Sequence, residues 1–80
     1  MENTAIEELR AHLMATNEEF RRLAAQHAEY SKRVDEIKNM HAPSDQDQIE
    51  EVRLKKLKLH LKDRMAEMIS RAAQDRQRVA

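Results

Sequence analysis

Four histidines are the side chains of this sequence best suited to chemistry, because imidazole binds metals and exchanges protons near neutral pH. They are His12, His27, His41 and His60. A zinc site needs three or four converging ligands. The carboxylates near His27 and His60 do not complete such a set; they are Glu29, Asp63 and Glu67. We therefore expect no metal site, and we interpret His27 as a partly buried residue and His60 as a surface residue.

Other catalytic groups have no supporting pattern. The chain lacks cysteine and glycine, which excludes disulfides, thiol chemistry, cysteine-ligated metals and glycine-rich phosphate loops. Its serines have no triad arrangement nearby; they are Ser31, Ser44 and Ser70. A pocket with converging polar groups, which most active sites need, is not expected from two helices. We expect no catalytic residue, no cofactor and no enzyme activity.

A basic block is the strongest charge feature of the sequence. Its cations are Arg53, Lys55, Lys56, Lys58, Lys62 and Arg64, with Asp63 as the one acidic member. Such a block can bind nucleic-acid phosphates without sequence preference, an anionic membrane or an acidic protein. Three carboxylates of the first helix could instead neutralise it; they are Glu29, Asp35 and Glu36. We favour ion pairing, then a protein partner, over nucleic acid or lipid, because the net charge is zero and the two aromatic residues are assigned to the core.

The elements that must position these residues are long helices. The chain has 80 residues, of which 38% are charged, with one proline and no glycine, a composition typical of long helices or coiled coils. No apolar run approaches the roughly 20 residues of a membrane span. The first residues do not resemble a signal peptide, so we expect a cytoplasmic location.

The first helix is predicted over about residues 4–40. Thr4 and Glu7 have the spacing of a capping box. Apolar residues then recur in steps of three and four, typical of a coiled-coil-like seam. They are Ile6, Leu9, Leu13, Phe20, Leu23, Tyr30, Val34 and Ile37, interrupted by Thr16, His27 and His41. A second capping signal at residues 16–19 leaves two alternatives: one continuous helix, or a short angled helix over about 4–15 before the main one.

A turn at residues 41–44 precedes a second helix over about 45–77. Pro43 disfavours helical geometry at Ala42, and Ser44 can cap the next helix. One stripe of this helix is apolar; it consists of Leu54, Leu57, Leu61, Met65 and Met68. So short a connection makes an antiparallel hairpin. It sets Val34 opposite Leu54, Leu23 opposite Met65 and Phe20 opposite Met68. The prediction is therefore a single all-α hairpin domain over residues 1–80.

The second helix carries another apolar line on its opposite side, formed by Val52, Leu59, Ala66 and Ala73. Scattered apolar residues are normal on surfaces. However, two helices bury only one seam, which is little support for a chain of this size. We therefore expect a homo-oligomer or a helical protein partner. The interaction surface is predicted at Val52, Lys55, Lys56, Leu59 and Lys62.

The basic block also carries a family resemblance. Residues 52–63 read V-R-L-K-K-L-K-L-H-L-K-D, which is similar to the V-x-x-[LM]-K-K-x-K-L-x-L-K-D signature of the YdcH-like small bacterial proteins. Phe20, Leu23 and His27 are similar to the first-helix pattern of that family. Glu18 departs from it, because relatives often carry a helix-starting proline there, and this favours a break near residue 17. The resemblance implies a helical hairpin of unknown function and transfers no catalytic residue.

Overall fold

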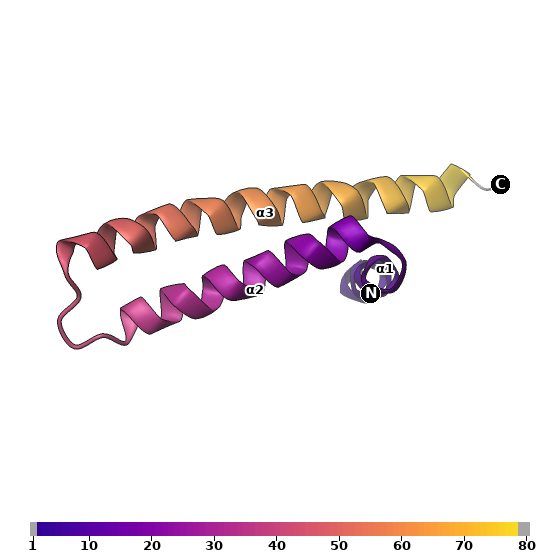
Figure 1. The fold of residues 1–80 in the computed structure, drawn as a ribbon. Helices are drawn as coiled ribbons and strands as arrows, with labels where there is room; N and C mark the ends of the chain where they lie inside the picture. Colours follow the sequence, from indigo (N-terminus) through magenta and orange to yellow (C-terminus); the bar gives the residue numbers. More distant parts are fainter. Residues whose placement is uncertain (1, 79–80) are drawn as a thin grey trace.

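The computed structural model describes the backbone of residues 2–78 and the side-chain environments of residues 5–76. The described residues form three helices and no strand: α1 (Glu2–Thr16), α2 (Glu18–Lys38) and α3 (Asp45–Arg78). The predicted all-α class is confirmed. Figure 1 shows α2 and α3 side by side and antiparallel, joined by the loop at residues 39–44. The molecule is elongated, with extents of 57 × 21 × 18 Å.

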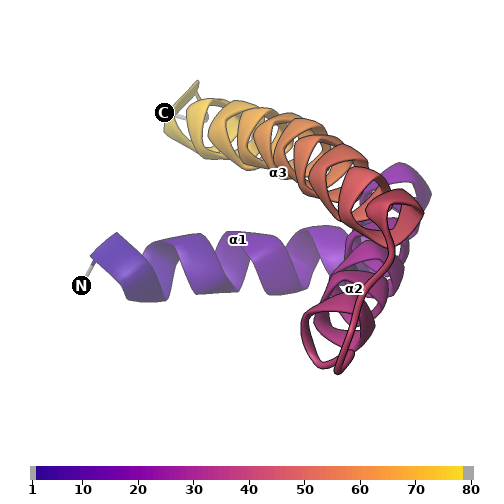
Figure 2. The same ribbon diagram turned by 90° about the vertical axis from the view of Figure 1, so that its left-hand side faces the viewer.

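The junction between α1 and α2 is a single residue, Asn17. Its backbone is extended, with φ −120° and ψ 113°. Its side-chain oxygen accepts a hydrogen bond from the Phe20 backbone N–H at 2.9 Å, so Asn17 satisfies a free donor at the start of α2. Of the two alternatives left by the sequence, the structure has the interruption. Figure 1 shows α1 nearly end-on and Figure 2 shows it lengthwise, running to one side of the hairpin.

The start of α1 differs from the prediction, and its end is capped by a side chain of α2. The helix already includes Thr4, so the predicted capping box does not start it, and the Thr4 side chain lies outside the described environments. At the other end, the Arg21 guanidinium reaches back from α2. It donates to the backbone carbonyls of Met14 at 3.1 Å and Ala15 at 3.3 Å. These carbonyls belong to the last turn of α1, where no intrahelical donor is available.

The loop between α2 and α3 is set by its own hydrogen bonds. α2 ends at Lys38, where the Asn39 N–H donates to the Asp35 carbonyl at 3.0 Å. The Ser44 hydroxyl accepts from the Asp47 N–H at 3.0 Å, and the Ser44 N–H donates to the Asp47 carboxylate at 3.0 Å. This reciprocal pair is a capping box. The predicted cap at Ser44 is therefore confirmed.

Two apolar clusters hold the helices together. The larger one consists of Leu9 and Leu13 from α1, Phe20 from α2, and Met65 and Ile69 from α3. The smaller one, near the loop, consists of Val34, Ile37 and Leu54. Phe20 is 0% exposed. The predicted partners Phe20 and Met68 pack in the first cluster, and Val34 and Leu54 lie in the second, as the two apolar stripes require.

Three residues depart from the predicted core. Leu57 is 38% exposed and Ile6 is 44% exposed, so the prediction that both lie in the seam is wrong. Ile69, which is not on the predicted stripe, is buried instead. The physical reason is that α1 does not continue along α2: its Leu9 and Leu13 pack with Met65 and Ile69. Because α1 also packs against α3, the buried residues of α3 differ from those expected for a hairpin of two helices alone.

Candidate interaction surfaces

The predicted interaction residues share one exposed side of α3. Val52, Lys55, Lys56, Leu59 and Lys62 are all exposed, and their spacings of three, four and seven residues place them on one helical side. Val52 is 55% exposed and Leu59 is 57% exposed, and the sequence analysis missed Ile49, which is 60% exposed. Ile49 lies three residues before Val52 and extends the same stripe. We call these six residues the outer face of α3.

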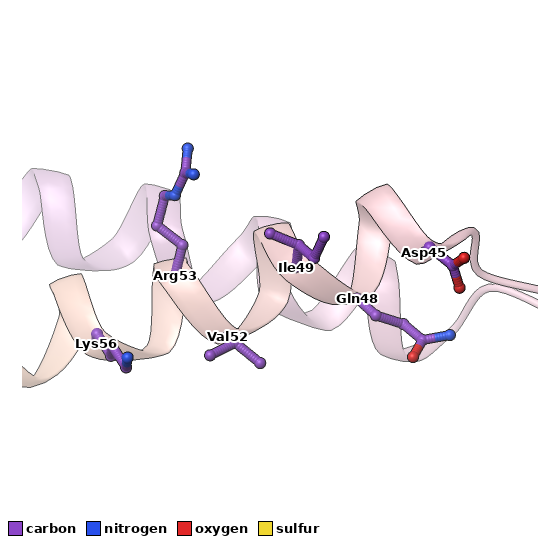
Figure 3. Close-up of a pocket in the computed structure, with 6 residues that line it drawn as sticks. All are labelled: Asp45, Gln48, Ile49, Val52, Arg53 and Lys56. Carbon is purple, nitrogen blue, oxygen red and sulfur yellow. The ribbon is translucent and has the colours of Figure 1, made fainter.

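A shallow hollow covers the loop-proximal part of this face. Figure 3 shows the residues that border it, which are Asp45, Gln48, Ile49, Val52, Arg53 and Lys56. Its volume is about 850 Å³. All six residues belong to α3, so the hollow has a single wall. Small-molecule sites usually surround most of their ligand, and a one-walled apolar surface is better suited to packing against another helix.

The basic block is only partly paired. Arg64 contacts Glu19 of α2 at 3.0 Å, and the hydrogen bond and charge of Glu19 raise the Arg64 pKa. Lys55 contacts Glu51 on its own helix at 3.0 Å. Four further cations of the block have no ion-pair partner among the described residues; they are Arg53, Lys56, Lys58 and Lys62.

The carboxylates expected to neutralise the block do not do so. Glu36 contacts Arg33 on its own helix at 3.6 Å, and within residues 5–76 neither Glu29 nor Asp35 takes part in an ion pair. Arg33 instead reaches α3, with its Nη2 2.9 Å from Glu50. The ion pairs between α2 and α3 therefore lie at Arg33 and Arg64, near the two ends of α2.

A second candidate site, which the sequence did not indicate, is a groove between α1 and α3. Its volume is about 430 Å³. It is lined by Ile6, Leu9 and Arg10 of α1, His27 of α2, and Lys62, Met65, Ala66, Ile69, Ser70 and Ala73 of α3. We call it the α1–α3 groove. It depends on how α1 is placed, which apolar periodicity alone does not specify.

His27 borders this groove and is half-buried, as predicted. Burial lowers its pKa below the ordinary value of 6.5, and the charges of Lys58, Lys62 and Arg10 lower it further. The imidazole is therefore mostly neutral at pH 7. His60 is exposed, also as predicted. Over the described residues, no three histidine or acidic side chains gather closely enough to hold a metal ion, and no described helix is long and apolar enough to cross a membrane.

Comparison with known proteins adds one relationship. A family model described as "Protein of unknown function (DUF465)" matches residues 20–69. The matched segment contains α2 from Phe20 onward and α3 as far as Ile69, including the whole outer face of α3, whereas α1 lies before it. No curated protein and no solved structure matches the chain.

Proposed function

Since the chain belongs to the DUF465 family of proteins of unknown function, we propose a function from the hairpin surface: the outer face of α3 binds a helix, first of all that of a second copy. The family match confirms the resemblance to the YdcH-like proteins. The proposed role is non-enzymatic. The proposal also takes up the coiled-coil-like seam expected from the sequence and the angled N-terminal helix, which was one of the two alternatives that the sequence left open.

The observation that carries this proposal is the exposure of three large aliphatic residues on one side of one helix. Ile49, Val52 and Leu59 each have more than half of their surface exposed. Large apolar residues exposed together on one side of a helix can mark a protein interface. Because the three residues follow the spacing of a helical seam, a second helix can cover them together.

The charges on the same stripe favour an antiparallel arrangement. Continuing from Ile49 in steps of three and four residues, the stripe includes Lys56 and Asp63. In a parallel pair, Lys56 would face its own copy across the seam, as would Asp63, and like charges repel. An antiparallel pair instead brings Lys56 near Asp63 of the second copy.

The available apolar surface predicts weak association. Full burial of one such side chain is worth about 1.5–3 kcal/mol. Since the three residues are a little over half exposed, covering them in both copies gains on the order of 5–10 kcal/mol. Association itself costs roughly 4–15 kcal/mol. We therefore expect a reversible dimer in the micromolar range or weaker, with no tight permanent complex.

Sedimentation of the full chain over a wide concentration range tests the proposal. The wild-type chain should shift from monomer toward dimer as concentration rises, and Leu59→Lys should remain monomeric. Met14→Lys is the matched control, because Met14 is also exposed but lies on α1. A wild-type chain that stays monomeric at millimolar concentration, or a Leu59→Lys chain that associates normally, would refute the role of this face.

The second candidate function is sequence-independent binding of nucleic acid or another polyanion. It rests on the cations of the basic block without ion-pair partners in the described part of the chain, among them Lys56 and Lys62. Reversing the charges of Lys55, Lys56 and Lys62 together should abolish salt-sensitive retention on DNA. Leu59→Lys should leave that retention intact, which separates the two functions. Retention that does not depend on salt would count against this candidate.

A further inference from the structure

We propose that the α1–α3 groove binds a free single-chain amphiphile with an anionic head group, such as a medium-chain fatty acid. This site shares Lys62 with the outer face of α3, and its other lining residues lie outside that face. It uses α1, which lies before the segment matched by the family model. The proposal therefore does not depend on self-association.

The length of the groove suits an extended alkyl chain. Its α3 wall extends from Lys62 to Ala73, which is about 16 Å at 1.5 Å per residue. An alkyl chain is thin, since its carbons contact their neighbours at about 4 Å. One such chain can therefore lie along the groove.

The walls supply the apolar contacts that such a chain needs. Leu9, Met65 and Ile69 line the groove and are buried. Between these large residues, Ala66 and Ala73 leave open space because their side chains are small. An alkyl chain lying there would lose contact with water on the side that faces these walls, and full burial of one methylene is worth about 0.8 kcal/mol.

The charges that border the groove are all of one kind. Arg10, His27 and Lys62 are its ionisable lining residues, and none of the ten lining side chains is a carboxylate. Within the described part of the chain, Arg10 and Lys62 form no ion pair. The chain as a whole has a net charge of zero, whereas the ionisable side chains that line the groove are all basic. It complements an anionic head group.

One of these cations marks an end of the groove. Lys62 lines it together with Arg10 of α1 and His27 of α2. Lys62 is the first α3 residue of the groove and Ala73 the last. A bound carboxylate would therefore lie near Lys62, and the alkyl chain would extend toward Ala73.

Titration calorimetry of the full chain with decanoate, kept below its micelle concentration, tests the proposal. Decanoate should bind saturably at one site, 1-decanol more weakly, and decyltrimethylammonium not at all. Ala66→Phe should reduce the affinity at least tenfold by filling the groove. Lys62→Gln should reduce it up to about fivefold, as for an exposed ion pair. Lys56→Gln, on the outer face of α3, should bind like the wild type.

Several results would overturn the proposal. Equal binding of decanoate and 1-decanol would show that the bases do not select an anion. Normal binding by an Ala66→Phe chain, or equal losses in Lys62→Gln and Lys56→Gln, would show that the ligand is elsewhere. Circular dichroism of each variant guards against misfolding, and Lys62→Gln alters only an exposed side chain. The monomeric Leu59→Lys chain should still bind decanoate, so failure of the dimer and failure of this site are distinguishable.

Discussion

Replacing Phe20 with alanine tests whether one residue joins all three helices. Phe20 is fully buried in the cluster that includes Leu9 and Leu13 from α1 and Met65 and Ile69 from α3. Truncation of a buried phenylalanine costs about 3–5 kcal/mol, because the lost apolar contacts are followed by an incompletely filled cavity. We expect Phe20→Ala to fall at the upper end of this range, since the side chain is completely enclosed.

The stability lost in Phe20→Ala is large relative to the total stability of the chain. At about 0.05–0.15 kcal/mol per residue, a chain of 80 residues has a total stability on the order of 4–12 kcal/mol. Phe20→Ala should therefore remove at least a quarter of the unfolding free energy and can unfold the chain outright. For a domain of this size, each kcal/mol corresponds to roughly 4–8 °C in the melting temperature. The expected decrease is thus at least about 12 °C.

Urea unfolding followed by far-UV circular dichroism measures the effect, at a concentration low enough to keep the chain monomeric. Met14→Ala is the control, because Met14 is exposed and lies outside both clusters. It should change the unfolding free energy by no more than about 0.5 kcal/mol. If Phe20→Ala proves no more destabilising than Met14→Ala, then Phe20 does not join the three helices and the described packing is incorrect.

Two further predictions concern the helix junction and the pH dependence. Asn17→Ala should lower the unfolding free energy by about 0.5–2 kcal/mol, because the Phe20 N–H loses its acceptor. Urea unfolding measures this loss, with Gln26→Ala at an exposed position as the control. Equal unfolding free energies for the two variants would show that the cap is unimportant. The lowered pKa of His27 means that the unfolded chain binds this proton more tightly, so stability should fall as the pH drops below 6.5 and level off below the folded pKa. In His27→Gln, the urea midpoint should depend less on pH between about pH 7 and 5. If the variant keeps the pH dependence of the wild type, His27 is not the cause. The lowered pKa of Asp47 acts separately, because its contribution to stability is lost only below the ordinary value of 3.8.

The hairpin itself was predictable from the sequence because local signals and long-range pattern agree. Pro43 and Ser44 mark the end of one helix and the start of the next, and the Ser44 cap is present. The apolar stripes on either side then come into register, so that Val34 and Leu54 meet in one cluster. Agreement between local turn and capping signals and the long-range apolar pattern is what allows a sequence to specify a fold.

The placement of α1 was not predictable in the same way. The capping signal at residues 16–19 offered a break as one of two alternatives, but the apolar periodicity, which continues through Thr16, does not show which direction α1 takes from the extended backbone of Asn17. The direction of α1 depends on that one residue and on the packing of Leu9 and Leu13. As a result, the burial of Ile69 and the α1–α3 groove were both missed. Ile49 is a different case, since its spacing from Val52 was visible in the sequence and could have been used.

The middle of the hairpin is the part whose stability we expect to respond to pH, because of the polar groups that lie there. The two apolar clusters lie at opposite ends of α2, one around Phe20 and the other around Val34 and Ile37. Between them lies His27, half-buried beside the cations of α3. Burial and the charges of Lys58, Lys62 and Arg10 lower the pKa of His27, so we expect acid to weaken the hairpin at this point. An anion in the α1–α3 groove would offset the same charges. The proposed anion site and the proposed acid-sensitive site therefore share Arg10, His27 and Lys62, and we expect both to depend on α1 because Arg10 belongs to it.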